Sequence, residues 1–205
     1  MIRRLAFAAV LLLAPAAAAH AQEVTTRVPL VGPYVSGSLG FNAPTGADYP
    51  SDIGGGLAGM ITAGWRMSPV LALEASWYGA GISDRDGSGT LDAIGLDARI
   101  YPFLYYGPRG GYYRPRVEPN FLVGLVPYTG QLTPAGDHLG GYGLDLGAGL
   151  RWRTRSPFYF TTDVRWMPLR YTSVDGDSLS PAFRGDDVAL MVGIGWQFPI
   201  IVMRP

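Results

Sequence analysis

The chain has 205 residues, with 16 basic and 16 acidic side chains and no cysteine, so its formal net charge is zero. This length suits one domain of ordinary size. Without a basic excess the chain lacks the electrostatic footprint of a nucleic-acid-binding protein, and without cysteine it has no disulfides. Its stability must therefore come from packing and backbone hydrogen bonds.

The first 21 residues have the pattern of a secretory signal peptide. A basic start at Arg3 and Arg4 precedes an alanine-rich apolar run from Leu5 to Ala19. That run is short for a membrane span, and the small residues of Ala19-His20-Ala21 fit a cleavage site. We expect cleavage before Gln22, which leaves residues 22–205 as the mature domain.

Apolar and polar side chains then alternate with a period of two in eight segments, which is the pattern of β-strands with two different faces. In the clearest segment, Leu144 and Leu146 share the apolar face and Asp145 lies on the other. In the weakest, Tyr128 falls on the polar face. The eight predicted strands are Tyr34–Phe41, Leu57–Arg66, Leu71–Tyr78, Ile94–Tyr101, Asn120–Tyr128, Tyr142–Arg153, Phe158–Trp166 and Val188–Phe198.

The connections between these strands alternate in length. Tight turns are predicted at 67–70 and 154–157, and a longer turn at 103–119. Long polar loops rich in Gly, Asp, Ser and Pro are predicted at 42–56, 79–93, 129–141 and 167–187. Long and short connections at opposite ends predict a meander of antiparallel hairpins.

The two faces of the predicted strands favour a membrane barrel over a soluble sandwich. The polar faces hold mostly glycine and small residues, with few charges, whereas a face in water usually carries many. The apolar faces end in aromatic residues, as in the girdles of transmembrane barrels: Trp65, Trp77, Tyr101, Tyr142, Trp152, Trp166, Trp196 and Phe198. We predict an all-β fold, an eight-stranded antiparallel up-and-down transmembrane β-barrel over residues 22–205, closed so that every backbone group is paired.

Eight strands enclose a lumen that side chains can fill. The polar faces direct four acids and four arginines into it: Arg66, Glu74, Asp97, Arg99, Asp145, Arg151, Asp163 and Arg165. We expect a buried network of ion pairs, because a lone charge in so narrow a space is costly. A selectivity constriction in a small channel is the alternative interpretation of the same residues.

Three segments carry a family resemblance: GWRMSPVLALEASWYGAG at 64–81, GGYGLDLGAGLRWR at 140–153 and VALMVGIGWQF at 188–198. They resemble the second hairpin, sixth strand and last strand of the small eight-stranded outer-membrane barrels of the OmpA-transmembrane-domain and OmpX type. The resemblance implies a Gram-negative outer membrane, with long loops outside and short turns in the periplasm. It also implies contact with outer-membrane lipid and lipopolysaccharide, and insertion by the outer-membrane assembly machinery. Members of this family usually stop at a terminal aromatic, which corresponds to Phe198, but this chain continues to Pro205.

These features favour a non-enzymatic, monomeric surface protein with a largely filled lumen, which supports envelope integrity or surface contacts. A narrow channel for small or apolar solutes is the alternative, and a lipid A-modifying enzyme is the third hypothesis. Only His138 remains as a histidine after signal cleavage, and spacing places no nucleophile or orienting acid beside it. We therefore predict no catalytic residue and no cofactor.

The segment DRDGSGTLD at 84–92 resembles the start of a calcium-binding EF-hand loop. The candidate ligands are Asp84, Asp86, Ser88 and Asp92. Position twelve of such a loop falls on Gly95, so the bidentate glutamate is missing, and the flanks are predicted strands instead of helices. We expect a polar turn here, and a weak cation site at these four residues is the minor alternative.

Overall fold

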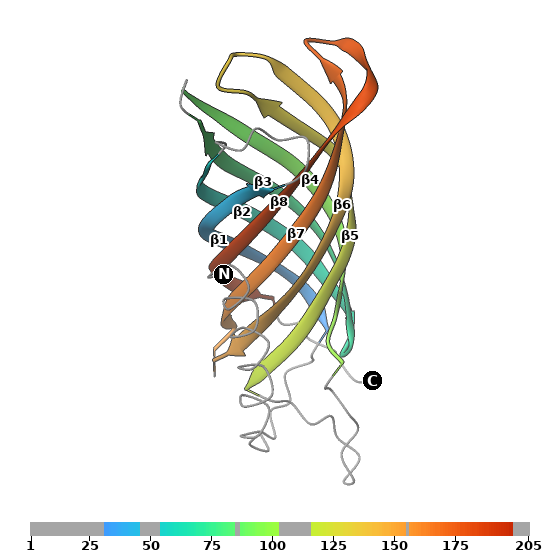
Figure 1. Cartoon of the computed structure of the whole chain (residues 1–205). Coiled ribbons are helices and arrows are strands. Elements are labelled where there is room, and N and C mark those ends of the chain that lie inside the picture. The colour runs from blue at the N-terminus through green and yellow to red at the C-terminus, as the bar shows by residue number, and fades with distance from the viewer. Residues whose placement is uncertain (1–30, 46–53, 85–86, 103–115, 155, 199–205) are drawn as a thin grey trace, which may run out of the picture.

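The computed structural model describes residues 31–45, 54–84, 87–102, 116–154 and 156–198. The predicted signal peptide and the tail after Phe198 lie outside the described residues. Eight antiparallel strands pair in chain order, and β8 pairs with β1 to close a barrel (Figure 1). The strands are β1 Gly32–Thr45, β2 Gly54–Ser68, β3 Leu71–Ser83, β4 Ser88–Ile100, β5 Val117–Leu132, β6 His138–Arg153, β7 Phe158–Val174 and β8 Asp177–Gln197. The predicted eight-stranded up-and-down barrel is confirmed.

The barrel has two distinct ends (Figure 1). We call the end where β1–β2, β3–β4, β5–β6 and β7–β8 are connected the hairpin end, which is the upper end in Figure 1. The opposite end, where β1 begins and β8 ends, is called the turn end. The turn between β2 and β3 there is only Pro69-Val70, as the sequence predicts.

The strands reach further at the hairpin end than the alternation predicts. The predicted loop at 167–187 is almost entirely strand, because β7 and β8 are joined by Asp175 and Gly176 alone. Both residues have positive φ, 50° and 91°, as the two central positions of a type I′ hairpin turn require. The expectation of a long loop here is wrong. Toward the tip the strands no longer have one lipid-facing side, so the alternation fades while backbone pairing continues.

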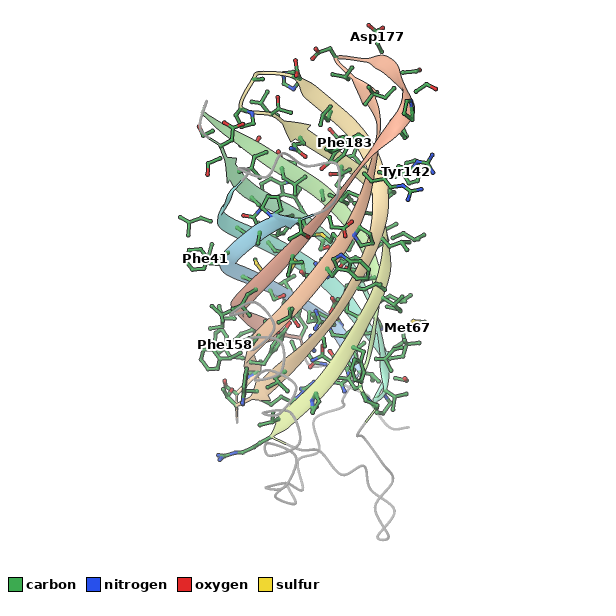
Figure 2. All side chains as sticks on the ribbon, viewed as in Figure 1. Phe41, Met67, Tyr142, Phe158, Asp177 and Phe183 are labelled. Atoms are coloured by element: carbon green, nitrogen blue, oxygen red, sulfur yellow. The ribbon has the colours of Figure 1, made fainter. Side chains whose placement is uncertain are left out.

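The predicted apolar faces form the outer wall of the barrel. Leu39 and Leu57 are 73% and 72% exposed, and large apolar side chains are exposed on all eight strands or immediately beside them. Figure 2 shows Phe41, Met67 and Phe158 pointing away from the barrel. An apolar outer wall of this extent fits a barrel surrounded by lipid. No helix in the described part of the chain is both long enough and apolar enough for a bilayer span.

Two aromatic residues lie on the face opposite to the predicted one. Tyr101, expected in an aromatic girdle, is fully buried, because it follows the outward-facing Ile100 and the strand pleat turns it inward. Tyr128, expected on the inner face, is 54% exposed. A β-bulge in β5 between Val126 and Thr129 shifts the alternation and turns Tyr128 outward.

Candidate functional site in the barrel lumen

Three layers of side chains follow one another along the lumen from the turn end to the hairpin end. The inward face of β7 contributes to all three, because every second residue of a strand points to the same side. Tyr159 belongs to the first layer, Asp163 and Arg165 to the second, and Met167 to the third. All four are buried.

The second layer is a group of ion pairs that we call the ionic plug: Glu74, Asp97, Arg99, Asp145, Asp163 and Arg165. Each of these residues is at most 5% exposed. Arg99 on β4 donates from Nε to Glu74 Oε1 at 2.6 Å and from Nη1 to Asp163 Oδ1 at 2.7 Å. Glu74 lies on β3 and Asp163 on β7, four strands apart in a ring of eight, so Arg99 joins opposite walls of the lumen.

Arg165 makes a second connection across the plug. Its Nη2 lies 2.9 Å from Asp97 Oδ2 on β4, and its Nη1 lies 3.2 Å from Asp145 Oδ2 on β6. The same Nη1 lies 2.7 Å from the sulfur of Met60 on β2. Side chains from four strands therefore meet at one guanidinium in the middle of the lumen.

The first layer, nearer the turn end, is an aromatic enclosure around Arg151. We call Tyr34, Tyr101 and Tyr159 the tyrosine cage. The Arg151 Cζ lies 4.2 Å from the ring centroid of Tyr159, 4.7 Å from that of Tyr34 and 5.3 Å from that of Tyr101. These distances fall within the range of cation–π attraction. The Tyr34 hydroxyl also donates to Glu74, so the cage is hydrogen-bonded to the plug.

Glycines make room for two rings of the tyrosine cage. A Cβ atom at Gly64 would collide with the ring of Tyr34, and a Cβ atom at Gly195 would collide with the ring of Tyr159. Each ring lies across bare backbone of the neighbouring strand and reaches Arg151 from there. Part of the glycine content of the inner face thus has a local steric cause.

The third layer, toward the hairpin end, is apolar. It consists of a cluster of buried residues that we call the apolar cluster: Ala58, Met60, Tyr78, Ala80, Leu91, Ala93, Val126, Met167, Leu169, Tyr171, Ala189 and Met191. Leu139 and Phe183 pack against it. The sequence placed several of these residues in loops and so did not predict this layer.

The structure adds charged residues that the sequence analysis missed. Glu118 is buried, and its Oε2 accepts a hydrogen bond from Arg66 Nη1 at 2.9 Å. Its Oε1 lies 2.8 Å from Nε of Arg153. The sequence assigned Glu118 to the turn at 103–119, but β5 begins at Val117. The polar alternation of Glu118 with Asn120 was the signal that could have extended the strand.

Asp187 is a second missed acid, and its surroundings differ from those of the plug. It is fully buried on β8, in the segment predicted as a loop. Its carboxylate accepts hydrogen bonds from the Tyr78 hydroxyl at 2.7 Å and from Asn42 Nδ2 at 3.0 Å. Asn42 Oδ1 in turn accepts from the backbone N–H of Gly56 at 2.8 Å. Neutral donors from β1 and β3, in place of arginines, thus satisfy this carboxylate.

Comparison with known proteins supports what the geometry indicates. The family described as outer membrane protein beta-barrel domain matches residues 6–200. The chain belongs to this family. It is an outer-membrane β-barrel protein with transmembrane strands, as the sequence predicted.

Three solved structures share the fold of this outer-membrane barrel. Neisserial surface protein A is 15% identical, with a TM-score of 0.60 over 82% of this chain and 97% of its own. OprG from Pseudomonas aeruginosa is 14% identical, with a TM-score of 0.53 and the same coverage. AlkL, solved by solid-state NMR in lipid bilayers, is 13% identical, with a TM-score of 0.53 over 90% of this chain and 98% of its own. No curated protein sequence matches the chain.

All eight charged residues predicted to line the lumen of this outer-membrane barrel are buried. Six of them form the ionic plug. Of the remaining two, Arg151 lies in the tyrosine cage with its Nη2 3.8 Å from Glu74 Oε1, and Arg66 pairs with Glu118. Their functional role stays a prediction.

The four candidate calcium ligands are spread along the β3–β4 hairpin. The Asp84 carboxylate accepts the N–H of Gly87 at 3.0 Å and so closes the turn. Ser88 and Asp92 are four residues apart on β4, roughly 13 Å along a strand. Asp86 lies outside the described residues. The described part of the chain has no group of three or more His, Asp or Glu side chains that could hold a metal. A cation site at these residues stays a prediction.

His138 lies at the hairpin end, where β6 begins. Its backbone N–H donates to Asp175 Oδ1 at 3.0 Å, which fixes the tip of the neighbouring hairpin. The nearby Ser173 hydroxyl donates to the carbonyl of Gly140 at 3.4 Å. Within the described residues, this serine and this histidine are not hydrogen-bonded as a nucleophile and its base would be.

Proposed function

We propose that this outer-membrane barrel is a non-enzymatic protein with a closed lumen, which supports envelope integrity or surface contacts. The observation that carries the proposal is the connection of Arg99 to Glu74 and Asp163 on opposite walls. A solute that crossed the lumen would have to separate these groups. Separation would leave buried charges unpaired, which is strongly unfavourable.

The tyrosine cage adds a second barrier between the plug and the turn end. Arg66 lies with its Cζ 3.9 Å from the ring centroid of Tyr101, and Arg151 is surrounded by three rings. Bulky side chains fill two successive layers, so a passage would require both layers to rearrange. This arrangement favours closure over a selectivity constriction.

The outer wall and the hairpin end support the envelope role. The apolar wall fits lipid, and the paired strands of β7 and β8 continue well past Trp166 to a two-residue turn at Asp175-Gly176. In the orientation implied by the family resemblance, this hairpin projects from the cell surface. A paired hairpin that extends beyond the apolar wall offers a surface for external contacts.

A narrow channel for small or apolar solutes is the second candidate. The apolar cluster favours it, because an apolar solute that entered from the hairpin end would meet an apolar lining. The ionic plug would then have to open to release the solute. The two candidates therefore differ in one property, which is whether the plug and the tyrosine cage open.

Planar-bilayer conductance of the purified full-length barrel separates the two candidates. We expect no discrete current steps from the wild type, and steps from the double variant Arg99→Ala/Arg165→Ala, in which both cross-links of the plug are removed. Arg170→Ala is the matched control, because Arg170 is exposed on the same strand as Arg165. Steps from the wild type would overturn the closed lumen. A silent double variant would show that the tyrosine cage, which it retains, closes the lumen without the plug.

The non-enzymatic part has a separate test. Lipid A extracted from cells that express the wild type and from cells that express His138→Ala should have the same composition. A lipid A modification made by the wild type and lost in His138→Ala would overturn this part of the proposal and leave the lumen conclusion unaffected.

A further inference from the structure

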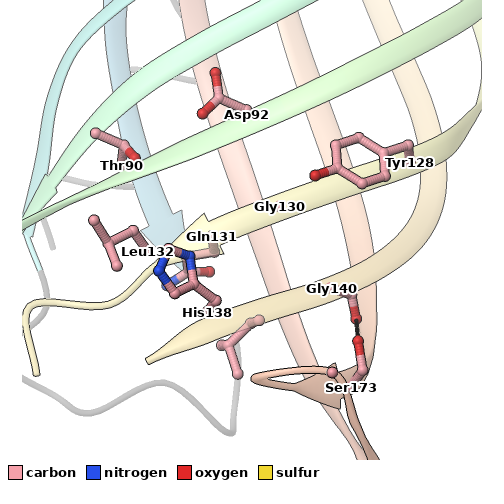
Figure 3. A pocket seen from close by; sticks show the side chains of 11 residues that line it. Thr90, Asp92, Tyr128, Gly130, Gln131, Leu132, His138, Gly140 and Ser173 are labelled. Atoms are coloured by element: carbon pink, nitrogen blue, oxygen red, sulfur yellow. Dashed lines mark hydrogen bonds between the residues drawn. The ribbon is translucent and has the colours of Figure 1, made fainter. Parts of the chain in front are cut away.

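A cavity of about 380 Å³ lies on the outer wall near the hairpin end, over β4 to β7 (Figure 3). Asp92, Gly130, Gly140 and Ser173 pair in register across these four neighbouring strands and line it together. The two glycines in the middle of the row carry no side chain. They form a floor of bare backbone between Asp92 on one side and Ser173 on the other.

The remaining walls come from the rows above and below this floor. Thr90, Leu132 and His138 pair in register two residues closer to the hairpin tips. Tyr128 lies on the other side, and its hydroxyl would be only 2.8 Å from a Cβ atom at Gly130. A side chain at position 130 would therefore force the end of the Tyr128 ring to shift. The β-bulge that turns Tyr128 outward supplies the cavity with its aromatic side chain.

The cavity lies directly above the apolar belt of the outer wall. Ile94 and Tyr128 are cross-strand partners, and they are the large exposed apolar side chains nearest the hairpin end on β4 and β5. Aromatic residues at this level mark the boundary between the hydrocarbon and the polar head groups. The cavity therefore opens sideways at the depth of the head groups and sugars of the outer leaflet.

The lining has the chemistry that a sugar ring needs. The apolar face of an aromatic ring packs against the C–H groups on one face of a pyranose. The Asp92 side chain offers oxygen acceptors, the Thr90 hydroxyl can donate and accept, and the His138 ring nitrogens offer further polar contacts. The Ser173 hydroxyl donates to the carbonyl of Gly140 and can still accept. The volume is within the range of about 300–1,000 Å³ typical of small-molecule sites. Among the residues that the structure describes, no arginine or lysine lines the cavity, so the charge of this lining does not favour a phosphate group.

We propose that this cavity binds a neutral sugar of an outer-leaflet glycolipid, with the sugar ring packed on Tyr128. The inference names a ligand for the envelope role of the proposed function and rests on that role. It does not depend on the lumen, so a conducting barrel would leave it intact and a failed sugar test would leave the closed lumen intact.

Calorimetry on the full-length barrel in detergent micelles tests the inference with three probes: a dephosphorylated core oligosaccharide of lipopolysaccharide, inorganic phosphate and calcium chloride. We expect the oligosaccharide to bind, and Tyr128→Ala to weaken its binding about tenfold. Gly130→Ala should also weaken it by displacing the Tyr128 side chain. Tyr142→Ala is the matched control, because Tyr142 is exposed to a similar degree on the neighbouring strand and does not line the cavity.

Every variant should keep the heat-dependent gel shift of a folded barrel, so that loss of binding is separated from loss of folding. Absence of oligosaccharide binding to the folded wild type would overturn the inference. Binding of phosphate or calcium alone would overturn it in favour of an ionic site. An equal loss of oligosaccharide affinity in Tyr128→Ala and Tyr142→Ala would also overturn it. The sugar would then contact exposed aromatic residues of the outer wall in general and not this cavity.

Discussion

The two halves of the lumen are filled by different kinds of interaction. Toward the turn end, the ionic plug and the tyrosine cage connect named atoms on opposite walls through directional contacts. Toward the hairpin end, the apolar cluster fills the space through packing that has no preferred direction. Directional contacts fix which walls meet, whereas apolar packing excludes solvent from the interior. In this barrel, the ionic plug and the tyrosine cage close the lumen, and the apolar cluster fills the rest of it.

The largest expected loss of stability is at Arg99, whose removal breaks the ion pairs of the ionic plug. Arg99→Ala leaves Glu74 and Asp163 without their main partner, and we expect the free energy of unfolding to fall by about 3–5 kcal/mol. Urea unfolding in micelles, followed by tryptophan fluorescence, measures it. Arg170→Ala, at an exposed site, should change the value by no more than about 0.5 kcal/mol. A loss of about 1 kcal/mol or less for Arg99→Ala would contradict the prediction, because it would match an ion pair exposed to solvent on a protein surface.

The apolar half should respond to loss of volume. Met191 is fully buried in the apolar cluster, and Met191→Ala should lower the free energy of unfolding by about 2–5 kcal/mol through lost burial and the cavity left behind. The same urea titration measures it, and the variant should remain silent in planar bilayers because the plug is intact. Met67→Ala is the control, since Met67 is 57% exposed on the outer wall. Current steps from Met191→Ala would contradict the separation of closing from filling.

A smaller loss of stability is expected at Gly195, whose missing side chain leaves room for the Tyr159 ring of the tyrosine cage. Gly195→Ala would push the ring of Tyr159 away from Arg151, and we expect a loss of about 1–3 kcal/mol from the strain of overpacking. Gly37→Ala is the control, because a Cβ atom there would meet no other atom within 4 Å. Equal unfolding free energies for the two variants would show that the ring does not depend on the glycine.

The smallest effect is expected at the boundary between the two halves. Tyr78→Phe keeps the ring in the apolar cluster but removes one of the two hydrogen bonds to Asp187. We expect a loss of about 1.5 kcal/mol, as for a hydrogen bond to a charged group. Tyr142→Phe, at an exposed position, should leave the unfolding free energy nearly unchanged. A null result at Tyr78 would mean that Asn42 alone satisfies Asp187.

The number of strands and the faces of most of them could be predicted from the sequence. Lipid on one side and a packed lumen on the other impose a strict alternation, as in Leu144-Asp145-Leu146. The hairpin end could not be predicted in this way, because this constraint no longer holds there. The dipeptide Asp175-Gly176 was the local sign of a tight turn inside the expected loop. This sign comes from the residues that a hairpin turn prefers, so alternation of apolar and polar residues does not reveal it.

The charged residues of the lumen could be named in advance, but their partners could not. Alternation places Arg99 and Asp163 on inward faces, whereas their contact depends on the stagger of strands around the closed ring. Glu118 and Asp187 were missed because they fall in predicted connections. The outward turn of Tyr128 was missed because a β-bulge changes the alternation without a clear signal in composition.

The hydrogen bond between Asn42 and Asp187 joins the first strand of the barrel to the last. These two strands lie 145 residues apart in the chain at this contact and become neighbours only when the ring closes. The bond therefore cannot form in any open intermediate, however many of the other hairpins are already paired. A spectroscopic probe placed at this pair would report the last step of insertion into the membrane, separately from the formation of the sheet.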